Sequence, residues 1–176
     1  VRSMVTLNTG DATYPATLIV HDRLISTRPD FRKTWLLHSI EQPTVNGTTI
    51  TVRRVGEAYG GGAYGGKLVA ESLLPREADI DVIGGPGREF WIESAGTNFA
   101  ATKAAPAEPG AWRVEVSTDG AREHEFLHVL TVMDDTTPAG PRVTTVEAER
   151  AVAVDVLGHV VVFADGEPEF VTADGE

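Results

Sequence analysis

The feature that most limits how this sequence can fold is a series of short stretches in which every second residue is apolar. A period of two places alternate side chains on opposite faces of an extended strand, as in a half-buried β-sheet. Gly, Pro, Asn and Asp separate the stretches, and these residues favour tight turns between antiparallel strands. The pattern predicts strands at residues 4–8, 16–26, 32–40, 48–54, 67–74, 80–83, 89–93, 111–118, 123–132, 143–148, 151–156 and 160–164.

The sequence shows no convincing helical period, and it therefore predicts an all-β protein. We expect an antiparallel β-sandwich of about a dozen strands with negligible helix. The chain has 176 residues, 41% of them hydrophobic and none of them cysteine, which suffices for one β-sandwich domain over residues 1–176 with its own core. Alternation within the predicted strands assigns four side chains to that core, namely Phe90, Trp112, Val114 and Leu130.

Charge is divided unevenly along the chain. Residues 1–76 contain nine Lys and Arg against six Asp and Glu, a balance of +3. Residues 77–176 contain six against twenty, a balance of -14, which gives -11 in total. This balance argues against nucleic acid as a partner, because binding phosphates requires a basic surface. No apolar run is long enough for a membrane span, so no membrane partner is expected, and an anionic ligand should contact the first part of the chain.

Basic residues around the connection between the second and third predicted strands form a candidate contact for an acidic polysaccharide. Guanidinium groups can bind carboxylate or sulfate in a bidentate way, although an ordinary solvated loop explains the same residues about equally well. A nearby glycine-rich segment presents two tyrosines to a ligand or a neighbouring domain, or is a plain connection. A tryptophan predicted to point outward between two glutamates is unusual for a strand. The candidate contacts are Arg23, Arg28, Arg32, Lys33, Tyr59, Tyr64 and Trp91.

Ionisable residues on apolar faces are interpreted as structural. His38 shares a predicted face with Leu36 and Ile40, which favours a buried histidine with one hydrogen bond over a catalytic or metal-binding role. Asp22 is predicted to be buried and to need a partner from another strand. The familiar spacings of serine hydrolases and zinc proteases are missing, so we predict no catalytic residue, no metal and no cofactor.

Several segments resemble, in their order, the β-domain of heparinase II/III-like proteins. They cover most of residues 18–132 and include both apolar and turn residues. The segments are 20–27 (VHDRLIST), 33–39 (KTWLLHS), 66–68 (GKL), 72–75 (SLLP), 84–91 (GGPGREFW), 109–116 (PGAWRVEV) and 126–130 (FLHVL).

This resemblance implies that the chain is the C-terminal portion of a larger polysaccharide lyase, secreted or periplasmic. Such proteins carry an α/α-toroid before a layered β-sandwich, and they cleave uronic-acid-containing polysaccharides by β-elimination. Their catalytic residues come mainly from the toroid and the beginning of the β-domain, and nothing in residues 1–17 matches their metal-binding stretch. The resemblance thus implies a non-catalytic sandwich that packs on the toroid and shapes a glycan cleft.

Two other functions remain open from the sequence. The chain could be a carbohydrate-binding module that works without a catalytic partner, which a row of exposed aromatic residues including Trp91 would favour. It could also be a purely structural β-sandwich. An exposed apolar surface on one side would favour the lyase interpretation, because a domain that packs on another presents a larger apolar patch than most monomers do.

Overall fold

The computed structural model describes residues 1–57, 61–99, 110–148, 151–164 and 167–172, and nearly all of its regular structure is antiparallel strand. In these ranges the only helical element is a three-residue 3-10 helix, η1 (Glu93–Ala95), and no helix is long and apolar enough to cross a membrane. The predicted all-β class with negligible helix is confirmed. The strands are β1 (Arg2–Asn8), β2 (Ala16–Ile25), β3 (Lys33–Ser39), β4 (Thr44–Asn46), β5 (Thr49–Glu57), β6 (Ala63–Leu74), β7 (Asp79–Gly84), β8 (Trp91–Ile92), β9 (Thr97–Asn98), β10 (Trp112–Thr118), β11 (Glu123–Asp134), β12 (Val143–Ala148), β13 (Ala151–Val156), β14 (His159–Ala164) and β15 (Glu167–Thr172).

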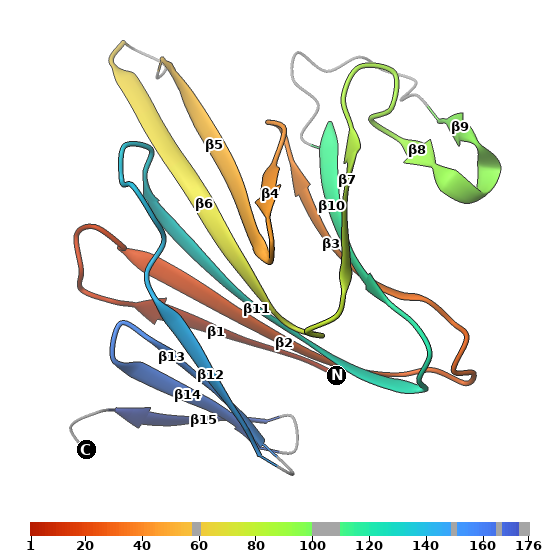
Figure 1. The fold of residues 1–176 in the computed structure, drawn as a ribbon. Coiled ribbons are helices and arrows are strands. Elements are labelled where there is room, and N and C mark those ends of the chain that lie inside the picture. Colours follow the sequence, from red (N-terminus) through yellow and green to blue (C-terminus); the bar gives the residue numbers. More distant parts are fainter. Residues whose placement is uncertain (58–60, 100–109, 149–150, 165–166, 173–176) are drawn as a thin grey trace.

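The strands form a sandwich of three layers. A central sheet with the order β1-β2-β11-β6-β5-β4 lies between the other two (Figure 1). One of its faces packs on the β3-β10-β7 sheet, and the other packs on a C-terminal sheet with the order β12-β13-β14-β15. Strands β8 and β9 pair with each other in a small lobe next to the β3-β10-β7 sheet.

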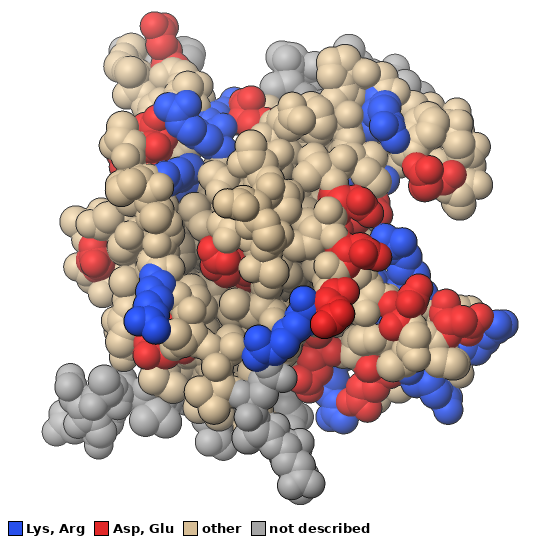
Figure 2. All heavy atoms as spheres, in the orientation of Figure 1, with Lys and Arg blue, Asp and Glu red and all other residues tan. Residues whose placement is uncertain are grey.

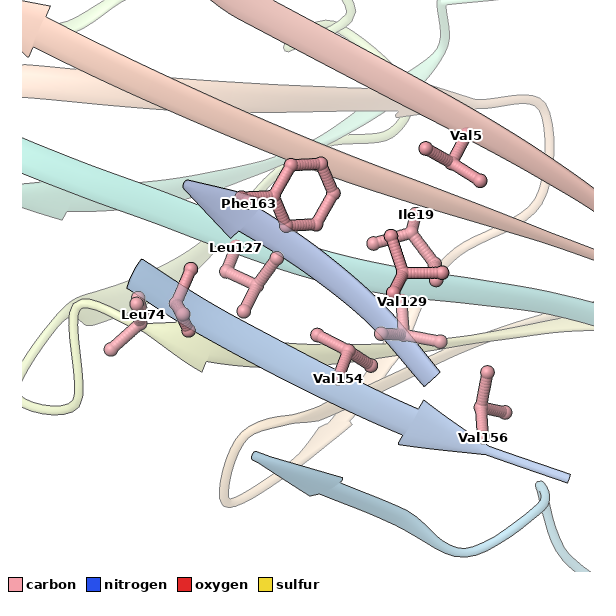
Figure 3. Close-up of a cluster of buried hydrophobic side chains, with 10 residues drawn as sticks. Val5, Ile19, Leu74, Leu127, Val129, Val154, Val156 and Phe163 are labelled. Carbon is pink, nitrogen blue, oxygen red and sulfur yellow. The ribbon is translucent and has the colours of Figure 1, made fainter. Parts of the chain in front are cut away.

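The C-terminal sheet packs on the central sheet through branched apolar side chains. Val154 and Phe163, from β13 and β14, are 0% and 1% exposed and contact the cluster that contains Leu127 and Val129 of β11 (Figure 3). The hairpin between β13 and β14 closes with a two-residue turn in which Leu157 has a φ of 54°. Two-residue turns with positive φ match the twist of antiparallel strands, so this turn supports the register in which β13 pairs with β14.

A second cluster joins the β3-β10-β7 sheet to the opposite face of the central sheet. Val114 and Val116 of β10 are completely buried, as the alternation in this strand predicts. Trp35 of β3 fills the same layer and packs with Val20 and Phe126 of the central sheet. Because both faces of the central sheet are covered, residues 126–131 of β11 are buried without interruption instead of alternating.

The buried face of strand β3 is the opposite of the face that the sequence analysis predicted to be buried. Trp35 is buried, whereas Leu36 is 48% exposed and His38 lies on the exposed face. The reason is tertiary, because β3 pairs with β10 and Trp35 stands opposite the buried Val116. The prediction of a core position for His38 was therefore wrong.

The predicted core is also partly wrong. Val114 and Leu130 are buried, but Phe90 and Trp112 are only half-buried. The predicted strand 89–93 shrinks to the two-residue β8, because this segment turns away from the sandwich into the separate lobe. Strands β4, β9 and β15 were not predicted, and the first two have too few residues to show a period of two.

Candidate functional site

A groove of about 1220 Å³ lies between the outer face of the β3-β10-β7 sheet and the lobe formed by β8, η1 and β9. The surface is hollowed beside this lobe, and acidic and basic side chains lie along the rim (Figure 2). The inner face of the β3-β10-β7 sheet packs in the buried core. The side chains that line the groove therefore come from its outer face, which carries polar and half-exposed residues.

The floor of the groove consists of two cross-strand rows on the outer face of the sheet. In one row, Glu115 of β10 lies between Leu36 of β3 and Asp81 of β7. In the next, Arg113 lies between His38 and Ile83. Paired residues of neighbouring strands project to the same face of the sheet. Each row therefore places an apolar side chain or an imidazole beside charged side chains on the floor of the groove.

Two ion pairs lie in the groove. Arg113 Nε donates to Glu115 Oε1 at 2.6 Å, and both side chains are largely shielded from solvent. Arg32 Nη2 lies 3.6 Å from Asp81 Oδ2 in a more exposed pair. Both guanidinium groups keep further N–H donors, so each pair offers donors and acceptors to a ligand that enters the groove.

The wall of the groove is the lobe that carries Trp91. The indole Nε1 donates to Glu93 Oε2 at 2.7 Å, and the guanidinium of Arg88 lies 4.8 Å from the centroid of the indole ring. These two contacts fix the orientation of the ring. Phe90 and Phe99 line the same groove, so three aromatic side chains border it.

Hydrogen bonds hold the lobe in shape. Asn98 Oδ1 accepts from the backbone N–H of Phe90 at 2.7 Å, and Phe99 N–H donates to the carbonyl of Phe90 at 3.2 Å. Backbone N–H groups of Glu89 and Gly87 lower the pKa of the Glu89 carboxyl, because they favour its ionised form. The lobe is therefore organised before any ligand arrives.

The structure brings two of the predicted contacts, Arg32 and Trp91, to the same groove. Lys33 is 6% exposed, and its Nζ donates to the carbonyl of Ala121, so it is not open to a ligand as predicted. The alternation of β3 decides this difference, since Arg32 precedes the strand and Lys33 faces its buried side.

The remaining predicted contacts lie outside the lining of the groove. Arg23 pairs with Glu123 of β11, and Arg28 binds Asp30 through two hydrogen bonds. Tyr64 is 41% exposed on β6, far along the chain from the lobe, and Tyr59 lies outside the described residues.

Asp22 has the partner that the sequence required. Arg2 of β1 donates to both of its carboxylate oxygens, with each distance 2.7 Å. The pair joins β1 to β2, and the side chain of Asp22 is only 8% exposed.

Among the residues that the structure describes, no group of His, Asp and Glu is arranged to hold a metal ion.

Sequence reasoning missed most of the groove floor. The alternation of Arg113 and Glu115 with buried valines does predict an exposed polar face on β10. It does not say that Leu36 and His38 flank that face, because this depends on the register between β3 and β10.

No protein-family model matches this chain, and no curated protein matches it significantly.

Proposed function

We propose that this chain is the non-catalytic β-sandwich portion of a heparinase II/III-like polysaccharide lyase and that it contacts glycan through the groove. The observation that carries the proposal is where the resembling segments lie. Segment 33–39 supplies one edge of the groove floor, segment 84–91 leads into the wall, and segment 109–116 includes the central strand of the floor. Segments distant in sequence thus meet at one surface.

The chemistry of the groove suits a saccharide. Aromatic rings can stack on the apolar face of a sugar, and Trp91 is held at the wall in a fixed orientation. The paired charges of Arg113 and Glu115 offer a donor and an acceptor close together, which matches neighbouring sugar hydroxyls. A fixed site binds with a smaller loss of side-chain entropy than a mobile one.

An apolar surface on the central sheet supports packing against the α/α-toroid of the parent protein. Ala16, Val132, Leu68 and Val52 form one row across β2, β11, β6 and β5. This row continues the face that the β3-β10-β7 sheet covers elsewhere, yet Val132 is 43% exposed. Met4, on the same face of β1, is 62% exposed. A helical domain seated here would remove these side chains from water.

The parent protein would act by β-elimination, in which a base removes the C5 proton of a uronate. The residues for this step are expected in the toroid and the beginning of the β-domain, and the parent is proposed to be secreted or periplasmic. The test compares this chain with the longer protein on heparin, heparan sulfate, alginate, ulvan and hyaluronan. We expect unsaturated uronate absorbance from the longer protein alone. Activity of this chain by itself, in a preparation free of contaminating lyase, would contradict the proposal.

A stand-alone carbohydrate-binding module is the second candidate. The observation in its favour is that residues of this chain alone form both the floor and the wall of the groove. Full glycan affinity of the isolated chain, unchanged in the longer protein, would favour this candidate. Glycan affinity that is weak in the isolated chain and higher in the longer protein would favour the lyase portion.

A further inference from the structure

We infer that the groove binds an uncharged saccharide unit and discriminates against uronate and sulfate groups, an inference that rests on the glycan-binding role proposed for the same groove. The unit would stack on Trp91 and lie over the Arg113–Glu115 pair. Acidic units of a polysaccharide would then be bound elsewhere in the parent protein, and the groove would hold the neutral units of the polymer.

The first argument is the charge of the lining. The charged side chains that line the groove are Asp81, Glu89, Glu93, Glu115, Arg32 and Arg113. These six described residues carry a formal charge of -2. Arg88 lies over Trp91 and outside this lining, and counting it still leaves a balance of -1. This negative balance disfavours an anionic ligand in the groove, and salt screens the effect over a Debye length of about 8 Å at physiological salt.

The second argument is that both arginines of the groove already have a carboxylate. Arg113 binds Glu115 at 2.6 Å, and Arg32 lies 3.6 Å from Asp81. A uronate could reach the remaining N–H groups of either guanidinium only by placing its negative charge beside the resident carboxylate, which would repel it. A hydroxyl has no such conflict, because it can accept from a remaining guanidinium N–H and donate to a carboxylate oxygen.

The third argument is the combination of an aromatic wall and a half-apolar floor. Leu36 and Ile83 lie in the floor rows, and Leu36 is 48% exposed. Trp91 stands at the wall with its N–H already satisfied by Glu93. Such a site favours the C–H surfaces of a sugar ring, which an uncharged unit presents without the desolvation of a carboxylate.

The experiment is an NMR titration of the isotope-labelled chain with four hexasaccharides, followed through the chemical shifts of its N–H groups. Three are neutral, built of β-1,4-linked glucose, mannose or N-acetylglucosamine, and the fourth is built of galacturonic acid. At about 20 mM salt, we expect at least one neutral hexamer to shift the indole N–H of Trp91 and the amides of Leu36 and Glu115. The galacturonate hexamer should bind about tenfold more weakly, and the gap should narrow at about 0.5 M salt.

Charge variants test the cause of the preference. Asp81→Asn and Glu93→Gln each remove one negative charge, and the glutamine still offers an acceptor to the Trp91 indole. Each should raise the affinity for the galacturonate hexamer relative to the neutral one about threefold at low salt. Asp155→Asn is the matched control, because Asp155 is exposed on β13 outside the groove and should leave this ratio unchanged.

The outcomes separate the two proposals. If the galacturonate hexamer binds the unmodified chain as tightly as the neutral hexamers, the inference about ligand class is overturned and the glycan-binding role stands. If Asp81→Asn and Glu93→Gln change the ratio no more than Asp155→Asn does, the charge argument fails. If no hexamer perturbs the groove, or if Trp91→Ala leaves all affinities unchanged, the glycan-binding role fails as well.

Discussion

The imidazole of His128 stacks on the indole of Trp35, with the ring centroids 3.8 Å apart and the ring planes inclined by 24°. His128 is completely buried, and burial lowers its pKa to about 3. Neither of its ring nitrogens has a hydrogen-bond partner among the described residues. The folded protein therefore holds this imidazole in its neutral form, which packs between the sheets as an aromatic ring.

The first prediction is that stability falls as the pH is lowered from about 6.5 to about 3. In this window the unfolded chain binds a proton at His128 and the folded chain does not, so the free energy of unfolding decreases by about 1.4 kcal/mol per pH unit. Burial also lowers the pKa of His21, which acts in the same direction. Urea unfolding at several pH values measures the slope.

A substitution isolates the contribution of His128. His128→Leu should reduce the slope between pH 6.5 and 3, because the leucine binds no proton in the unfolded chain. His38→Leu is the control, since His38 is exposed on β3 in the folded protein. Equal slopes for the unmodified chain and His128→Leu would show that His128 titrates alike in both states.

The second prediction concerns two glycines with nearly the same backbone. Gly85 and Gly87 have φ values of 81° and 79°. A Cβ at Gly85 would lie 2.8 Å from the Trp112 ring, whereas one at Gly87 meets nothing within 4 Å. Gly85→Ala should therefore destabilise the protein by about 1–3 kcal/mol more than Gly87→Ala does. Equal unfolding free energies in urea would show that Trp112 moves aside freely.

The third prediction compares two arginine–aspartate pairs. Arg2→Ala leaves the buried Asp22 without its partner and should cost about 1–3 kcal/mol at pH 7. Arg28→Ala breaks a pair with Asp30 in which both side chains are more than half exposed, and it should cost less than about 1 kcal/mol. Thermal unfolding of both variants checks the order, and a larger loss for Arg28→Ala would contradict it.

The fourth prediction ranks two tryptophans. Trp35 is 7% exposed in the cluster between the sheets, so Trp35→Ala should cost about 3–5 kcal/mol. Trp91 lies in the lobe outside both buried clusters, so Trp91→Ala should cost less than about 1 kcal/mol and affect glycan contact instead. Similar losses of unfolding free energy would place the lobe within the cooperative core.

Local chemistry in the sequence predicted the strands well. A strand is specified by alternation and by the turns that bound it, and both are properties of neighbouring residues. The buried Val114 and Val116 on β10 and the need of Asp22 for a partner follow from this kind of reasoning. The all-β class is the sum of many such local preferences.

The three layers and the groove were decided by tertiary structure. Period two tells which residues share a face but not which face is covered, so Leu36 and His38 were placed in the core although they line the groove. Leu127 and Val129 are buried only because the C-terminal sheet covers the second face of β11. The sequence by itself determined where the chain extends and turns. Sheet order and register decided which faces meet, because these depend on contacts between residues far apart in the chain.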